Sequence, residues 1–284
     1  MPTQTAVVIP IYQSTLSDAE RFSVANAVTV LARHDVYLIG PERLGAWLNT
    51  YAQTLGRPVA VCLFADHYFV NIEGYNRLML SKRLYQAFIG HEYILIAQTD
   101  SLVFKDDLER WASAGYSYLG APWFEGYTKP VQPLKLTSVG NGGFSLRSIP
   151  DFLRVLHRPR VFKNILMQNW PGSWISNTYR FLKDYHSLCF NDIQLNIKVN
   201  EDLFWGLFVT PQCSFFKVPT PVVALDFAFE AHPDHLFELN QQRLPFGCHA
   251  WQRYQPDFWV QTLGPQWFSR LETKLLIDQS STYN

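Results

Sequence analysis

The sequence has few charged residues, and the two signs are balanced. Asp, Glu, Lys and Arg make up 17% of the 284 residues, with 24 basic against 24 acidic side chains. A surface that binds nucleic acid needs a basic excess or stripe to neutralise phosphates. The charge balance therefore argues against nucleic acid as a partner.

Cysteine is scarce and scattered. The four residues, Cys62, Cys189, Cys213 and Cys248, form no Cys-x-x-Cys pair. Paired cysteines are typical of zinc sites, and a dense, regular spacing is typical of disulfide-stabilised secreted domains. We therefore expect free thiols in the reducing cytosol.

Long apolar runs are also missing. None approaches the ~20 residues that a membrane-spanning helix needs, and a strand pattern begins at Ala6, where a secretory leader would have its apolar stretch. We expect a cytoplasmic protein without a membrane span. The tail over 267–277 places Trp267, Leu271 and Leu275 on one helical face. This face suits either packing on the domain or peripheral contact at the inner face of the membrane.

Short apolar strands alternate with helical patterns through the first hundred residues. Strand patterns cover 6–10, 36–39, 59–64 and 93–97, and helical patterns begin with a capping box at Ser17 and continue over 46–51 and 72–88. Such alternation is typical of parallel βαβ units. It predicts a three-layer α/β/α fold with a mostly parallel central sheet, as one domain over 1–260 with a C-terminal helical extension over 261–284.

Polar side chains follow the strand pattern at 93–97. Gln98 and Asp100 stand at its carboxyl end, where open α/β sheets bind their ligands. A carboxylate there can hold a divalent cation against the phosphates of a nucleotide. The alternative is an Asp that only caps the next turn.

Other polar motifs follow further along the chain. Residues 140–147 read GNGGFSLR, and glycines around Asn141 allow a ligand close to the backbone, although a plain turn has the same composition. Residues 200–205 read NEDLFW, with two acids that either do chemistry or only compensate a helix dipole. His249 follows a glycine turn, and a lone His is more often a core residue than a metal ligand.

A strand predicted over 118–123 ends at Trp123, and an irregular loop is predicted over 125–138. In the aromatic segment 161–190, core packing is favoured over ligand stacking.

In chain order, these motifs resemble those of GT-A-type glycosyltransferases. The resemblance rests on VIPIY at 8–12, QTD at 98–100, GNGGFSLR, NEDLFW and PFGCHAW at 245–251. Over roughly 75–251 the chain is similar to a bacterial family of glycosyltransferase-like proteins long labelled as a domain of unknown function.

The resemblance implies roles for individual residues. Asp100 and His249 would hold Mn²⁺ or Mg²⁺ at the donor diphosphate, although Gln98 stands where the family pattern has an acid. Asp202 would be the catalytic base, with Glu201 as its neighbour or as the base itself. The other implied donor contacts are Pro10, Ile11 and Tyr12 around the base and ribose, together with Gln98, Asn141, Gly142, Gly143 and Arg147. The implied acceptor contacts are Trp123 and Trp205.

The function that follows is transfer of a hexose or deoxyhexose from a nucleotide sugar to a glycan or lipid-linked acceptor, with inversion, in polysaccharide biosynthesis. A non-catalytic module that binds nucleotide sugars or glycans is the alternative, and Gln98 is the argument for it. A sugar-phosphate nucleotidyltransferase would carry a glycine-rich loop with an arginine after its first strand, whereas residues 11–14 read IYQS.

Overall fold

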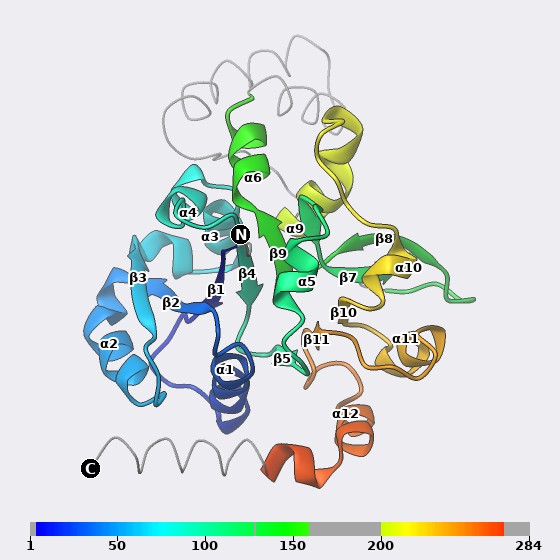
Figure 1. Ribbon diagram of the computed structural model, residues 1–284, viewed down its shortest axis with the longest axis horizontal. Helices are drawn as coiled ribbons and strands as arrows, with labels where there is room; N and C mark the ends of the chain where they lie inside the picture. Colours follow the sequence, from blue (N-terminus) through cyan, green and yellow to red (C-terminus); the bar gives the residue numbers. More distant parts are fainter. Residues whose placement is uncertain (1–3, 128, 159–199, 270–284) are drawn as a thin grey trace.

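The computed structural model of the protein describes residues 4–127, 129–158 and 200–269 (Figure 1). The aromatic segment 161–190 and the tail from 270 onward lie outside these residues, so the expectations for them stay predictions. Within the described part, no helix is both long and apolar enough to cross a membrane.

A six-stranded sheet in the order β3-β2-β1-β4-β9-β6 organises the chain. Its strands are β1 (Thr5–Pro10), β2 (Asp35–Pro41), β3 (Ala60–Phe64), β4 (Tyr93–Ala97), β6 (Tyr118–Leu119) and β9 (Phe144–Ser148). Strands β1 to β4 are parallel, while β9 is antiparallel to both β4 and β6. The predicted mostly parallel sheet is confirmed.

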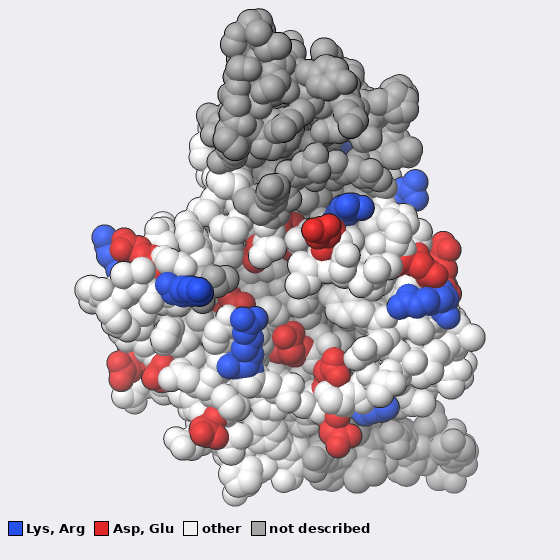
Figure 2. All heavy atoms as spheres, turned by 180° about the vertical axis from the view of Figure 1, so that it is seen from behind, with Lys and Arg blue, Asp and Glu red and all other residues white. Residues whose placement is uncertain are grey.

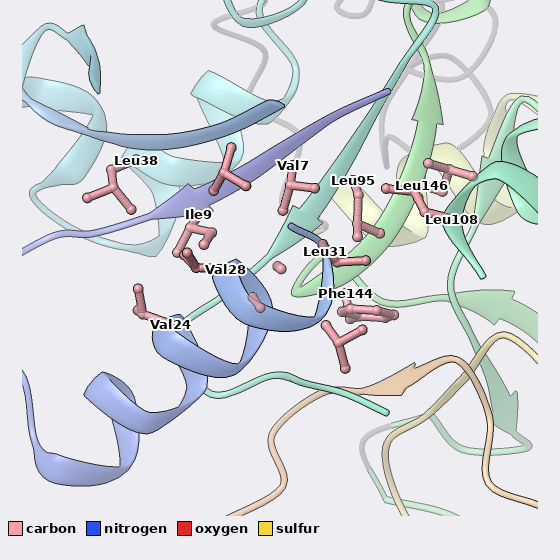
Figure 3. Close-up of a cluster of buried hydrophobic side chains, with 14 of the residues drawn as sticks. Val7, Ile9, Val24, Val28, Leu31, Leu38, Leu95, Leu108, Phe144 and Leu146 are labelled. Atoms are coloured by element: carbon pink, nitrogen blue, oxygen red, sulfur yellow. The ribbon is translucent and has the colours of Figure 1, made fainter. Parts of the chain in front are cut away.

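Helices cover both faces of this sheet. Strands β1 and β4 are buried along their whole length, as expected for near-continuous apolar strands. Because successive side chains alternate, Val7 and Leu95 face one layer while Val8 and Ile96 face the other. Figure 3 shows the first of these layers, where α1 packs against the sheet. The first layer contains α1 (Asp18–Val30), α2 (Gly45–Gln53) and α5 (Leu108–Ala112), and the second contains η2 (Asp66–Phe69), α3 (Ile72–Met79), α4 (Lys82–Ala87) and α6 (Ile149–Leu156).

Local capping decides where two of these helices begin. The capping box predicted at Ser17 is present, with the Ser17 hydroxyl accepting from the Glu20 amide and the Glu20 carboxylate accepting from the Ser17 amide. The single helix predicted over 72–88 is divided into α3 and α4. Ser81 caps α4 by accepting a hydrogen bond from the Arg83 amide at 3.0 Å, so the second helix starts anew.

The strand predicted over 118–123 is also divided. Its first part is β6, and the rest is β7 (Ala121–Phe124), which pairs with β8 (Leu136–Gly140) beside the central sheet (Figure 1). The two parts separate at Gly120, where a Cβ atom would overlap the carbonyl oxygen of Gly140. The end of the loop predicted over 125–138 is therefore strand β8.

Besides the apolar clusters on the two faces of the sheet, the described residues form a third apolar cluster. Buried Trp251 and Trp259 belong to it, and Trp267 and Phe268 pack against it. The described start of the predicted C-terminal extension thus contacts the domain. The remaining elements are η1 (Glu42–Leu44), β5 (Leu102–Val103), α9 (Glu201–Leu203), η3 (Phe204–Phe208), η4 (Thr210–Gln212), α10 (Pro221–Ala224), β10 (Ala228–Phe229), α11 (Pro233–Leu239), β11 (Gly247–Cys248) and α12 (Pro256–Leu263).

Candidate active site

A cavity of about 650 Å³ lies beyond the carboxyl ends of β1, β2 and β4. Tyr12, Arg43 and Gln98, which follow these three strands, line it. Residues later in the chain also line it: Asn141, Gly142, Gly143, Asn200, Glu201, Asp202, Glu230 and His249. The volume suits a small organic ligand, and the position is where open α/β sheets bind one. On the face shown in Figure 2, acids and bases are interspersed over a largely uncharged surface.

His249 lies at the centre of a polar group in this cavity. Its Nε2 is 3.2 Å from Asp100 Oδ1 and 3.3 Å from Gln98 Oε1, and its Nδ1 is 2.9 Å from Glu230 Oε1. Burial acts to lower the pKa of His249, but the two carboxylates outweigh it and raise the pKa to about 10. Burial is the largest influence on Asp100 and acts to raise its pKa, but the hydrogen bond and the charge of His249, with smaller contributions from the backbone and Arg253, together outweigh it, so this pKa is lowered. The structure therefore brings the side chains of Gln98, Asp100 and His249 into contact.

Glu230 is a member of this group that the sequence did not reveal. It follows β10, a strand of only two residues, which is too short to show a periodic pattern. Its bond to Nδ1 orients the ring so that Nε2 faces Asp100 and Gln98. Carboxylates hold metal-binding histidines in this manner.

The donor atoms around His249 fit a divalent cation only in part. No group of three or more His, Cys, Asp and Glu side chains suited to a metal ion occurs within the described residues. The amide oxygen of Gln98 nevertheless lies as close to His249 Nε2 as the Asp100 carboxylate does. Neighbouring ligands of an octahedral ion with bonds of ~2.1 Å are about 3 Å apart. Gln98 can thus supply an oxygen where the family pattern has an acid.

Glu201 and Asp202 are adjacent in the chain but differ in environment. Both carboxylate oxygens of Glu201 accept hydrogen bonds from Arg147, at 2.8 and 3.0 Å, in a pair that is almost fully buried. Asp202 lines the cavity half-buried, with one oxygen accepting from the Leu203 amide. Burial and, secondly, the charge of Glu201 raise the pKa of Asp202 to about 6. The geometry favours Asp202 over Glu201 as a base.

The glycines of residues 140–143, here called the glycine loop, leave space for other side chains of the protein. Asn141 has a left-handed φ of 91°, and its Oδ1 accepts from the Gly143 amide at 2.8 Å. A Cβ atom on Gly142 would overlap the Glu201 carboxylate, and one on Gly143 would overlap the His249 ring. The need for glycine is thus explained by Glu201 and His249, whereas the sequence suggested a closely approaching ligand.

Gly143→Ala is expected to lower the free energy of unfolding by about 1–3 kcal/mol, because the added methyl group forces the His249 ring to move. Urea denaturation measures the change. Gly90→Ala is the matched control, since nothing lies within 4 Å of a Cβ atom there. Equal stability of Gly143→Ala and wild type would show that the loop does not hold the ring.

Several expected contacts do not reach the cavity. Pro10 and Ile11 are buried, and Ile11 packs into the core, because the sheet continues to that point. Trp205 is 0% exposed and packs on Phe152 with ring centroids 4.0 Å apart. Arg147 is buried beneath Gly142 and bonds Glu201. Trp123 packs against Gly140 and Tyr127 and is not among the residues that line the cavity.

Three further residues line the cavity: Tyr12, which was expected from the sequence, and Arg43 and Tyr75, which were not. Tyr12 makes ring contacts with Phe69 and Tyr75, and burial raises the pKa of Tyr75 to about 12. Arg43 donates from Nη2 to the carbonyl oxygen of Tyr12 at 3.1 Å. Tyr75 lies on a helix whose apolar period indicated only core packing, so its sequence pattern carried no separate signal for a site.

The mostly parallel sheet with helices on both faces is a GT-A-like fold. The galactosyltransferase LgtC, in a crystal structure with donor and acceptor sugar analogs, matches with a TM-score of 0.50 at 12% identity, over 95% of each chain. The chain belongs to the family described as "Protein of unknown function (DUF5672)", whose sequence profile matches residues 58–249.

Two further crystal structures have lower similarity. The apo form of the glycosyltransferase GlyE of Streptococcus pneumoniae TIGR4 has a TM-score of 0.48 at 13% identity, over 95% of this chain and 63% of GlyE. Mouse xyloside xylosyltransferase 1 has a TM-score of 0.45 at 9% identity, over 87% of this chain and 96% of the mouse protein. The chain thus spans less than two thirds of GlyE. Among curated proteins there is no match.

Proposed function

We propose that this protein is an inverting glycosyltransferase that moves a sugar from a nucleotide sugar to a hydroxyl group of a glycan or lipid-linked acceptor. The observation that carries the proposal is the position of Asp202. This half-buried carboxylate, with a pKa of about 6, lines the same cavity as Gln98 and His249.

Asp202 is the base in this proposal. Its carboxylate takes the proton of the acceptor hydroxyl while that oxygen bonds to the anomeric carbon and the bond from the anomeric carbon to the diphosphate breaks. With a pKa near 6, the group is mostly ionised at pH 7 and still basic enough to accept a proton. Glu201 is occupied by Arg147 and serves as the neighbour.

Asp100, His249 and Gln98 would hold Mn²⁺ or Mg²⁺, with Glu230 orienting the ring of His249. When bound, the ion would offset the charge of the departing diphosphate. The charges of the cavity support a need for a cation. Asp202, Glu230, Arg43 and His249 line it, Asp100 contacts His249, and Glu201 is already neutralised by Arg147. With His249 protonated, the three remaining carboxylates outnumber the two cationic groups, so an anionic donor meets a site of net negative charge.

A nucleotide-sugar or glycan-binding module is the second candidate. Two observations favour it: Gln98 replaces an acid, and the described residues lack a cluster of three acidic, His or Cys ligands. A protein of this kind would bind a nucleotide sugar or glycan but would catalyse neither its hydrolysis nor sugar transfer. Detection of one turnover product excludes it.

A thermal-shift screen with nucleotides and nucleotide sugars, in Mn²⁺ or in chelator, tests the donor site. A ligand at 100 times its Kd raises the stability by about 2.7 kcal/mol, which corresponds to a rise of several degrees in Tm. We expect this rise for one nucleotide class in Mn²⁺ and its loss in Asp100→Ala.

Asp107→Ala is the matched control, because Asp107 pairs with Lys105 and Arg110 and is not among the residues that line the cavity. This variant should keep the wild-type shift. If no ligand raises the Tm of the wild type, the proposed binding of a nucleotide sugar in this cavity is contradicted. An equal shift in Asp100→Ala would remove Asp100 from it.

A further inference from the structure

Arg147 and Glu201 form a buried ion pair behind the cavity wall. The side chains are 0% and 3% exposed, and two nitrogens of Arg147 contact the two carboxylate oxygens. Arg147 also donates to Ser145 Oγ at 3.0 Å, to the Tyr85 hydroxyl at 3.3 Å and to the Gly142 carbonyl oxygen at 3.4 Å. The guanidinium group therefore links β9, the glycine loop and α9.

Stability alone does not explain a pair of this kind. Removing two charges from water is costly, and replacing a buried ion pair by apolar side chains of similar volume is often neutral or stabilising. Two of the segments that the pair joins border the cavity: Gly142 of the glycine loop lines it, and so do Glu201 and Asp202 of α9. The pair is thus placed to control the geometry of that wall.

The helix that carries Asp202 has few contacts of its own at its N-terminal end. Helix α9 continues directly into η3, whose Phe204 and Trp205 are buried, but its N-cap Asn200 makes no side-chain cap hydrogen bond. The Glu201 amide contacts Asn76 Oδ1 only at 3.4 Å. The two hydrogen bonds from Arg147 are short and charge-assisted, and they join this segment to β9.

We propose that Arg147 and Glu201 are positioning residues that hold the base Asp202 and the glycine loop in one fixed arrangement. The inference rests on the proposed role of Asp202. It has an electrostatic consequence as well, because Asp202 is near two acids, Glu201 and Glu230, and one cation, Arg147. After burial, Glu201 contributes most to the raised pKa of Asp202. Loss of its charge should therefore lower that pKa.

The double variant Arg147→Met/Glu201→Leu removes both charges and keeps most of the volume. We expect a Tm no lower than that of the wild type. We expect kcat for release of nucleoside diphosphate to fall by about 100-fold, with KM nearly unchanged, because a displacement of about 1 Å at a reacting group has this effect. The probes are UDP-glucose, UDP-galactose, UDP-N-acetylglucosamine and GDP-mannose, with water as acceptor.

Glu201→Gln keeps the shape of the pair and covers the case in which the double variant does not fold. Its kcat should fall about tenfold or more, and the pKa of Asp202 should fall by about one unit. NMR of ¹³C-labelled aspartate carboxyl groups measures this pKa without any substrate, and the Asp202→Asn spectrum assigns the signal. Asp106→Asn, which breaks the pair with Arg33 and His34, is the control that should change neither kcat nor the pKa of Asp202.

The readouts separate two kinds of failure. If the folded variants keep both the wild-type kcat and the wild-type pKa of Asp202, the positioning role is overturned. If the wild type releases no nucleoside diphosphate from any probe, the proposed function fails. In that case the pKa of Asp202 still tests the role of the ion pair. An unchanged pKa in Glu201→Gln overturns the inference, and a lowered pKa supports control of Asp202 by the pair.

Discussion

Asp202→Asn is expected to lower kcat/KM for sugar transfer by about 10²–10⁴-fold, the usual contribution of a positioned general base. Asn has nearly the same shape, and its side-chain oxygen can still accept from the Leu203 amide, but it cannot take a proton. Release of nucleoside diphosphate in the presence of acceptor measures the effect. Asp257→Asn, on an exposed position of α12, should retain the wild-type rate. Full activity of Asp202→Asn would assign the base to another residue.

The same residue predicts how the rate depends on pH. Since Asp202 must be ionised to act as a base and its pKa is raised to about 6, kcat/KM should fall about tenfold per pH unit below pH 6. A plateau is expected between pH 7 and 8. A profile that stays flat down to pH 5 would contradict the raised pKa of Asp202 or its role.

Asp202 should also reduce stability at neutral pH. Its pKa is higher in the folded protein than the ordinary 3.8, so the folded state binds the proton more tightly, and this contribution to stability is lost as pH rises from about 4 to 6. Asp202→Asn is therefore expected to be more stable than the wild type at pH 7, by roughly 1–3 kcal/mol. Urea denaturation at pH 4 and pH 7 tests this, since the difference between the proteins should shrink at pH 4.

Trp205→Ala is expected to lower the free energy of unfolding by about 3–5 kcal/mol, as for other buried aromatic residues cut to Ala. Trp205 is 0% exposed and packs on Phe152, Phe204 and Phe216 in the layer that contains α4 and α6. Its indole nitrogen is buried without a hydrogen-bond partner in the described structure. Trp205→Phe should therefore cost much less, because it loses volume but no hydrogen bond.

Trp123→Ala is the matched control for this prediction. Trp123 is partly exposed on the two-stranded sheet, so a loss near 1 kcal/mol is expected. Denaturant unfolding of Trp205→Ala, Trp205→Phe and Trp123→Ala measures the free energy of unfolding of each variant and so tests the expected order of stability. If Trp205→Ala is as stable as the wild type, the indole is not part of the core, and the acceptor contact inferred from the sequence regains its basis.

Much of the fold follows from local patterns. The strands at 93–97 and 5–10 are β-branched apolar runs, and the capping box at Ser17 starts α1 where it was expected. Alternation of such strands with helices leads to a parallel sheet covered on both faces. Two predicted elements, the helix over 72–88 and the strand over 118–123, are each divided in the structure. The helix is divided by the cap at Ser81, and the strand by the close approach of Gly120 to Gly140, after which β7 joins another sheet. Neither feature has a strong signal in the sequence.

The site was predictable where a residue follows a strand or begins a helix. Gln98, Asp100 and Asp202 were singled out in this way, whereas the role of Asp202 as a base and that of His249 as a metal ligand came from the family resemblance. Glu230 was missed, because nothing in a two-residue strand marks the acid behind it. The expected donor contact of Arg147 was replaced by an internal one, since a sequence does not show whether a cation meets a ligand or a carboxylate of its own chain.

The sequence by itself determined the strands, the main helices and the edge of the sheet at which polar side chains gather, because these depend on residues close together in the chain. Only the tertiary structure decided which polar groups meet. Arg147 reaches Glu201 across 54 positions, and Gln98 reaches His249 across 151. Such pairs form because burial leaves each charge or amide to find a partner wherever packing brings one, and no local pattern records that choice.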